Sequence, residues 1–153
     1  MRKQYSVLPK TEKVVLSEIR KISRGLKERM PGIVFWSNGN AKYEPDEETI
    51  YIPSLDWCAT YEPDLDAEEY WLLVFHEYAH FLSHAWKGFE GHSPEMYAIL
   101  TGLVLLTGLP LDSFYHVEAV YRLRSFQRGR QYAGNKLLLA MSKGTGEASG
   151  SLL

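Results

Sequence analysis

One long apolar segment constrains the fold of this chain more than any other feature. It begins after Asp66, a residue type that favours the N-cap of a helix, and Glu69 completes the pattern of a capping box. Gly88 is a typical end signal. The segment is apolar on most sides of a helical wheel, and most of its polar residues share one stripe: His76, His80, Ser83, His84 and Lys87. We therefore expect a largely buried helix from Asp66 to about Trp86.

Helices are also expected on both sides of this segment. Over residues 12–30 the apolar positions recur at three- and four-residue steps, namely at Val15, Ile19, Ile22 and Leu26. After the central segment, Ser93 as N-cap and Pro94 at the first helical position predict another helix. A further helix is expected over 112–126, and a shorter one over 136–142.

The sequence between the first two helices favours a small sheet. The β-branched and aromatic segments 33–36 and 49–52 predict strands. Residues 37–40 have the composition of a hairpin turn, so a return strand at 41–43 should pair with the first strand. Residues 53–65 carry turn formers and are expected to form a surface loop. The expected fold class is α+β, with a small, about three-stranded antiparallel or mixed sheet packed on the central helix and further helices.

Composition narrows the class of protein. A chain of 153 residues with 45% hydrophobic and 24% charged residues is expected to fold as one domain over 1–142. The Gly- and Ser-rich residues 143–153 are expected to be a disordered tail. The single cysteine, Cys58, excludes a disulfide framework and a zinc site built from several cysteines. No apolar run approaches the ~20 residues that span a membrane, and no signal-peptide core is present, so a cytoplasmic protein without a membrane partner is expected.

The polar stripe of the central helix contains the pattern HExxH, formed by His76, Glu77 and His80. Imidazoles four residues apart project from the same helix face and can reach one zinc ion at Zn–N distances of about 2.0–2.1 Å. Glu77, beside the first ligand, is placed to accept a proton from a water molecule at the ion. The alternative is an amphipathic helix whose histidines face water, but such stripes more commonly use Lys and Glu.

A zinc site of this kind needs a third protein ligand. His84 lies two helical turns beyond His76, about 12 Å along the axis, so both cannot hold one ion and His84 is expected beside the site. Glycines after the helix allow the chain to reverse, which favours His92 as the third ligand. Glu95, in the first turn of the next helix, is the alternative.

These motifs resemble a known family. His76-Glu77-x-x-His80, followed by Gly91-His92-Ser93-Pro94-Glu95-Met96, is similar to the small zincin metalloproteases of the SprT/Spartan type and to short metallohydrolases of actinobacteria and their phages. Those proteins carry a Gly-His-Gly-Pro-Glu-Phe-like second motif, so this chain differs at Ser93 and Met96. The resemblance covers about residues 49–108.

The resemblance implies a minimal zincin-like fold and a metallopeptidase that uses zinc (Zn2+) to cleave a peptide or protein substrate. It implies three zinc ligands and a general base, which map to His76, His80, His92 and Glu77. It also implies that the strand at 49–52 borders the cleft, where an extended substrate can pair with it. The residue that stabilises the oxyanion stays open among Tyr43, Tyr61 and Tyr97.

The charge distribution leaves other functions open. Residues 1–30 hold nine Lys/Arg against three Glu, and residues 44–69 hold ten Asp/Glu and no Lys/Arg. Such runs are commonly solvated faces. As in SprT-like relatives, a basic segment could instead recruit a protease to DNA through Arg122, Arg124, Arg128, Arg130 and Lys136. A non-catalytic, zinc-stabilised interaction module is the third possibility, although a structural site needs no base such as Glu77. A peptidase and another amide hydrolase are not distinguished.

Overall fold

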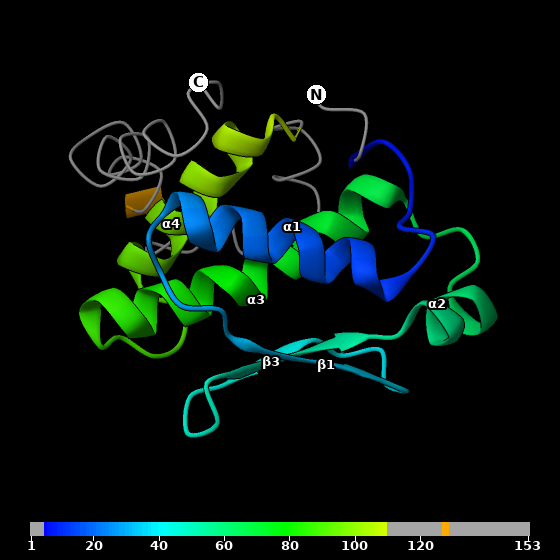
Figure 1. The fold of residues 1–153 in the computed structure, drawn as a ribbon, viewed down its shortest axis with the longest axis horizontal. Coiled ribbons are helices and arrows are strands. Elements are labelled where there is room, and N and C mark those ends of the chain that lie inside the picture. The colour runs from blue at the N-terminus through cyan, green and yellow to red at the C-terminus, as the bar shows by residue number, and fades with distance from the viewer. Residues whose placement is uncertain (1–4, 110–126, 129–153) are drawn as a thin grey trace.

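The computed structural model describes residues 5–109 and 127–128, and within them the chain forms four helices and a three-stranded mixed sheet (Figure 1). In chain order the elements are α1 (Glu12–Gly25), β1 (Gly32–Trp36), β2 (Lys42–Glu44), β3 (Thr49–Pro53), α2 (Leu55–Tyr61), α3 (Ala67–Lys87) and α4 (Pro94–Thr107). The α+β class expected from the sequence is confirmed. The helices expected over 112–126 and 136–142, and the tail at 143–153, lie outside the described residues.

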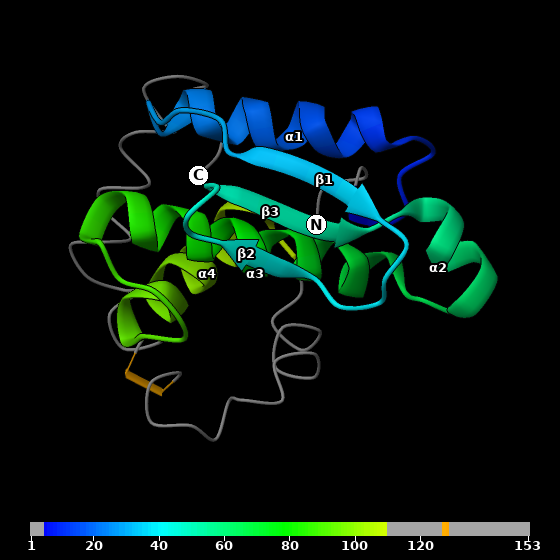
Figure 2. The same cartoon turned by 90° about the horizontal axis from the view of Figure 1, so that it is seen from below.

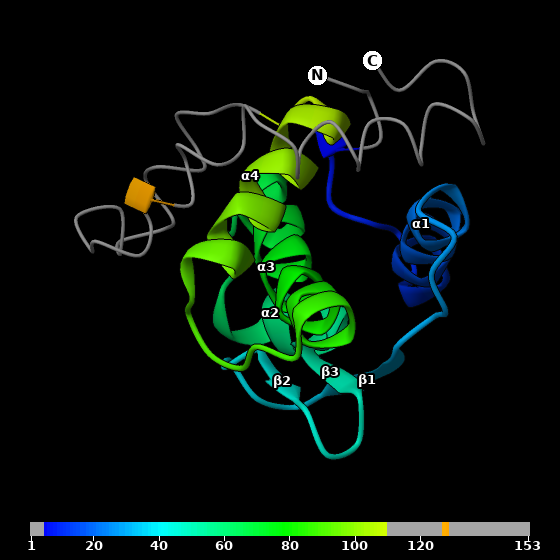
Figure 3. The same ribbon diagram turned by 90° about the vertical axis from the view of Figure 1, so that its left-hand side faces the viewer.

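The central helix, α3, begins and ends where the sequence predicts. Asp66 caps its first turn by accepting a hydrogen bond of 2.9 Å from the backbone N–H of Glu68. Gly88 ends the helix in the left-handed conformation, with φ of 70°. Figure 3 shows α3 between α1 and α4, with the sheet on a third side. Because other elements surround it, most of its side chains are buried.

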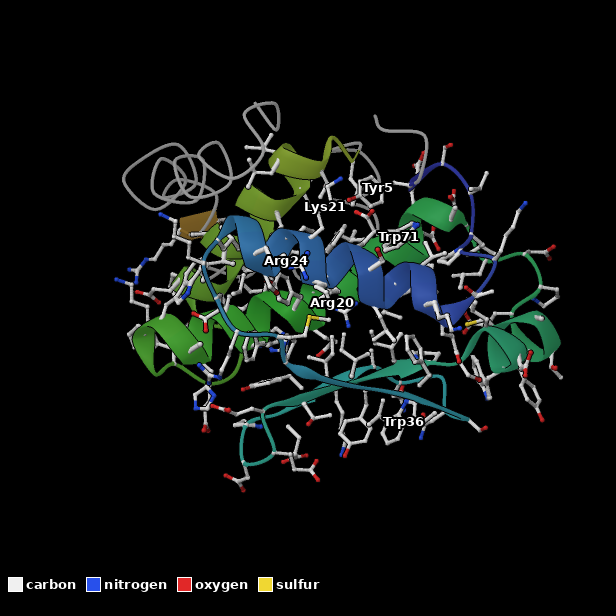
Figure 4. All side chains as sticks on the ribbon, viewed as in Figure 1. Tyr5, Arg20, Lys21, Arg24, Trp36 and Trp71 are labelled. Carbon is white, nitrogen blue, oxygen red and sulfur yellow. The ribbon has the colours of Figure 1, made fainter. Side chains whose placement is uncertain are left out.

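The N-terminal segment and α1 pack against α3 on the side of β1 (Figure 2). The ring of Tyr5 meets Trp71 of α3 edge-on, with 5.1 Å between centroids, and Trp71 stacks on Phe75. Figure 4 shows Tyr5 and Trp71 next to each other. Ser23 of α1 and Tyr78 of α3 share a buried hydrogen bond of 2.7 Å. The Tyr5 ring thus anchors the N-terminal segment on α3, and the Ser23–Tyr78 hydrogen bond joins α1 to α3.

The first helix was expected to continue to Met30, but α1 ends at Gly25. Lys27 adopts the left-handed conformation, with φ of 56°, and the backbone N–H of Glu28 donates to a carbonyl five residues earlier, as in a Schellman motif. Beyond this end, the Glu28 carboxylate accepts a hydrogen bond of 2.9 Å from the Trp86 indole N–H. A tertiary contact therefore replaces the last turn that the apolar periodicity predicts.

The order of the strands corrects the hairpin expected between β1 and β2. β3 lies between them, parallel to β1 and antiparallel to β2, where Tyr43 is opposite Ile50. The hairpin instead joins β2 to β3 through residues 45–48. Ile50 and Ile52 are both fully buried, whereas β2 has only three residues. The strand with the larger buried face takes the central position.

Residues 53–65, expected to be a loop, contain the short helix α2. Ser54 is its N-cap and accepts a hydrogen bond of 3.1 Å from the Trp57 backbone N–H. Both prolines of this segment, Pro53 and Pro63, lie outside the helix. Cys58 is buried in α2, and its burial raises the pKa of the thiol, which disfavours the reactive thiolate.

Candidate metal centre

Helix α3 supplies two imidazoles and a carboxylate to one site. His76 and His80 lie one turn apart, and their Nε2 atoms are 3.2 Å from each other. His80 is buried and His76 is partly exposed. Glu77, which follows His76, is only 6% exposed and lines the same cavity as both histidines. The three residues of the HExxH pattern are therefore together, as the sequence predicts.

The third imidazole comes from the segment between α3 and α4. Gly88 and Gly91 both adopt left-handed conformations, with φ of 70° and 74°, a backbone geometry that disfavours other residue types. The chain reverses here, and the Nε2 atom of His92 lies 3.2 Å from that of His76. The ring centroids of His92 and His80 are 4.7 Å apart. His92 therefore joins the two histidines of α3.

Two of the three imidazole pairs have the spacing of metal ligands. Two bonds of about 2.0–2.1 Å at a tetrahedral angle place ligand nitrogens about 3.3–3.4 Å apart, and the Nε2 atom of His76 lies 3.2 Å from those of His80 and His92. The candidate ligand atoms of His76, His80 and His92 all lie within 4.8 Å of one another, close enough to hold a metal ion. Within residues 5–109 and 127–128, neither Glu95 nor His84 belongs to this group. The structure thus favours His92 over Glu95.

The electrostatics of the site suit metal binding. Burial lowers the pKa of His80 to about 3, and the nearby rings of His76 and His92 lower it in the same direction. His80 is therefore neutral at pH 7. A neutral imidazole has the nitrogen lone pair that a metal ion requires.

A cavity of about 360 Å³ opens onto these side chains. One wall consists of Glu77 and the three histidines. A second wall comes from β2 and the residues beside it, namely Ala41, Lys42, Tyr43 and Pro45, and Gly91 lines the cavity next to His92. Because α1 packs on the β1 side (Figure 2), it contributes none of these lining residues. The N-terminal helix therefore leaves this opening uncovered.

The strand beside the cavity is β2, which corrects the expectation that residues 49–52 border it. β3 is the central strand and pairs with neighbours on both sides, so it offers no free edge along its paired residues. β2 is an edge strand of the sheet formed by the described residues (Figure 2). The Lys42 ammonium of β2 lies over the rings of Trp36 and Tyr51, at 5.3 and 4.9 Å from their centroids. No local sequence signal identified β2 as the strand next to the site, because strand order is a long-range property.

His84 lies beside the ligand group, as expected. Its Nδ1 atom is 2.8 Å from the Tyr43 hydroxyl, and its Nε2 atom is 4.0 Å from the Glu90 carboxylate. Burial raises the pKa of Tyr43 to about 12, so its phenol keeps its proton at neutral pH. Of the three tyrosines weighed from the sequence, Tyr43 lines the cavity, Tyr97 stacks on the His92 ring, and Tyr61 is 68% exposed on α2. Tyr43 is therefore the one of these three tyrosines that lines the cavity.

Comparisons with known proteins identify no relative of this chain, so the site is interpreted from its own residues. No family model, curated protein or solved structure matches this chain. In the part of the chain that the structure describes, no helix is both long and apolar enough to cross a membrane.

Proposed function

We propose that this protein is a zinc-dependent hydrolase, specifically a metallopeptidase of the small zincin type similar to SprT/Spartan-like enzymes. The observation that carries the proposal is the convergence of His76, His80 and His92 with the buried Glu77 in one cavity. Imidazole nitrogens are typical zinc donors. Three protein ligands are also the usual number in catalytic zinc sites, which keep a fourth position open, whereas structural sites have four.

Each residue of the site has a separate role in the proposed hydrolysis. Zinc held by the three imidazoles would polarise a carbonyl group and acidify water. The Glu77 carboxylate would accept the proton of the attacking water and deliver it to the leaving amine nitrogen. The free edge of β2 would hold an extended peptide through backbone hydrogen bonds. The protonated phenol of Tyr43, on the same wall, is a donor available to a substrate oxygen.

Metal content and peptide cleavage in matched variants test this proposal. Protein purified without chelator should contain about one zinc ion per chain and should cleave an unfolded protein substrate. His76→Ala should lose zinc and activity, while Glu77→Gln should keep zinc and lose activity because the base is gone. His84→Ala is the matched control, since it removes an imidazole from the same helix but outside the ligand group. Zinc-free native protein would contradict the proposal.

The same variants distinguish a zinc-stabilised interaction module from an enzyme. In a module, zinc would only hold α3 and the following segment together, so Glu77→Gln would leave partner binding and stability intact. Hydrolysis of small amides but not of peptides would instead point to a different amide hydrolase. A proteolytic activity that Glu77→Gln abolishes excludes both alternatives.

A second candidate function adds DNA binding to the hydrolase. Its support is a basic surface on α1, whose exposed residues lie at helical spacing: Lys13, Arg20, Lys21 and Arg24 (the last three are labelled in Figure 4). Within the segment Arg122–Lys136, the described basic residue, Arg128, is also exposed. Contacts with phosphates would make DNA affinity fall steeply with salt, and Arg20→Glu with Arg24→Glu should weaken it. Undetectable binding at low salt would exclude this function.

A further inference from the structure

We infer that Tyr97 is a positioning residue that holds the third ligand, His92, in place for the metal. The inference rests on the metal centre proposed above. His92 differs from the other two histidines because it is exposed and lies outside a helix, directly after Gly91 in its left-handed conformation. A ligand on such a segment loses conformational freedom on binding unless other contacts already restrict its ring.

The start of α4 places Tyr97 next to His92. Ser93 is the N-cap, and its Oγ atom accepts a hydrogen bond of 3.1 Å from the Met96 backbone N–H, while Pro94 occupies the first helical position. His92 is therefore the residue before the N-cap, and Tyr97 is the fourth residue of the helix. In a hydrophobic staple these two positions contact each other and fix the angle at which the chain enters the helix. Here the staple contains the proposed metal ligand.

The ring contacts agree with this geometry. The Tyr97 ring stacks on the His92 ring, with 5.8 Å between centroids and 26° between planes. It also meets His76 edge-on, with a centroid distance of 6.4 Å and an angle of 79°. Tyr97 is fully buried within the core that α3 and α4 share. One rigid ring thus contacts both the ligand that lies outside the helices and a ligand on α3.

Stacking of this kind becomes stronger when a metal binds. A coordinated imidazole gains positive character, and the face of a tyrosine ring attracts positive charge. Tyr97 should therefore restrict His92 in the metal-free protein and stabilise it further in the loaded protein. Loss of the ring should weaken metal affinity beyond any general loss of stability.

Zinc affinity of the full chain, measured by competition with a chelating dye, tests the inference. Tyr97→Leu should weaken zinc binding by roughly tenfold to a hundredfold, the usual effect of removing a group that orients a ligand. Tyr97→Phe keeps the ring and should retain affinity close to that of the native protein. Tyr70→Leu is the matched control, because Tyr70 is an equally buried tyrosine whose aromatic contact is with Trp71. It should lower stability but leave zinc affinity unchanged.

Two further measurements separate positioning from general destabilisation. The visible spectrum of the Co2+-loaded Tyr97→Leu protein should shift towards that of Co2+-loaded His92→Ala, because without the Tyr97 ring the His92 imidazole is no longer held in place to coordinate the metal. If Tyr97→Leu fails to fold, Ser93→Ala tests the same staple through its cap, with Ser93→Asn as the variant that restores the cap. Ser93→Ala should weaken zinc binding, and Ser93→Asn should restore it.

The outcomes distinguish this inference from the proposed function. Normal zinc affinity in Tyr97→Leu, or equal losses in Tyr97→Phe or Tyr70→Leu, would overturn the positioning role and leave the metal centre intact. If Tyr97→Leu does not fold, normal affinity in Ser93→Ala would overturn it in the same way. Native protein that binds no zinc would overturn both, because there would be no ligand set to position.

Discussion

Removing a single hydroxyl group should measurably loosen the contact between α1 and α3. The Oγ atom of Ser23 and the hydroxyl of Tyr78 are 2.7 Å apart, and the two side chains are only 2% and 0% exposed. Tyr78→Phe removes one partner and leaves the Ser23 hydroxyl without this bond in a site that water does not reach. Ser23→Ala removes the other partner, so the Tyr78 hydroxyl is then the buried group without this hydrogen bond.

The expected magnitude follows from this burial. A buried polar group that loses its partner costs roughly 1–3 kcal/mol, whereas replacing both partners by apolar groups can be nearly neutral. Each single variant should therefore lower the free energy of unfolding by about 1–2 kcal/mol. The double variant should cost no more than one single variant, so the coupling energy should be about 1 kcal/mol or more.

Urea unfolding followed by tryptophan fluorescence measures these energies on the full chain. The native protein, both single variants and the double variant form a double-mutant cycle. Zinc content should be the same in all four proteins, because the pair lies where α1 contacts α3 and not in the cavity. If the two single effects simply add in the double variant, the hydrogen bond does not stabilise the fold and the reasoning is refuted.

Three other perturbations follow from the structure. Gly91→Ala should weaken zinc binding in the dye competition assay. A side chain at φ of 74° costs about 1–2 kcal/mol, and the backbone change that relieves this strain would move His92. Unchanged zinc affinity would contradict this prediction. Burial raises the pKa values of Tyr70 and Tyr78, so above about pH 10 the unfolded chain loses protons that the folded chain keeps. The free energy of unfolding, measured in urea, should therefore fall as pH rises. The fall should be smaller in Tyr78→Phe, which lacks one of the two phenols. Gly39→Ala should lower the thermal midpoint, because the added Cβ would overlap the Trp57 ring. The nearby Ser37→Ala, at an exposed position, is its control and should leave the midpoint unchanged.

The residues of the candidate site could be predicted because their signals are local. HExxH spacing depends only on helix geometry, and the caps at Asp66 and Gly88 mark the helix that carries it. The proximity of His92 was predicted from the glycines after α3 and from the family resemblance, and the structure places it with the other two imidazoles. Glu77 was expected to share their site, and it lines the same cavity.

The wall of the cavity formed by β2 could not be predicted in the same way. Tyr43 and the rest of β2 are far in sequence from α3, and their place depends on which strand occupies the middle of the sheet. The turn at 37–40 favoured a β1–β2 hairpin, but burial of Ile50 and Ile52 places β3 between the two strands. The stacking of Tyr97 on His92 was missed as well, although the Ser93-Pro94 helix start contains the signal for it.

The sequence by itself determined the chemistry-bearing residues and the helices that begin and end around them, since capping, left-handed glycines and helical spacing act over a few residues. Only the tertiary structure decided that β2 and not β3 faces the histidines, and that α1 stops at Gly25 so that Glu28 can bond Trp86. These outcomes depend on contacts between distant segments. The energies of these contacts outweigh local preferences, and no short segment of the sequence indicates them.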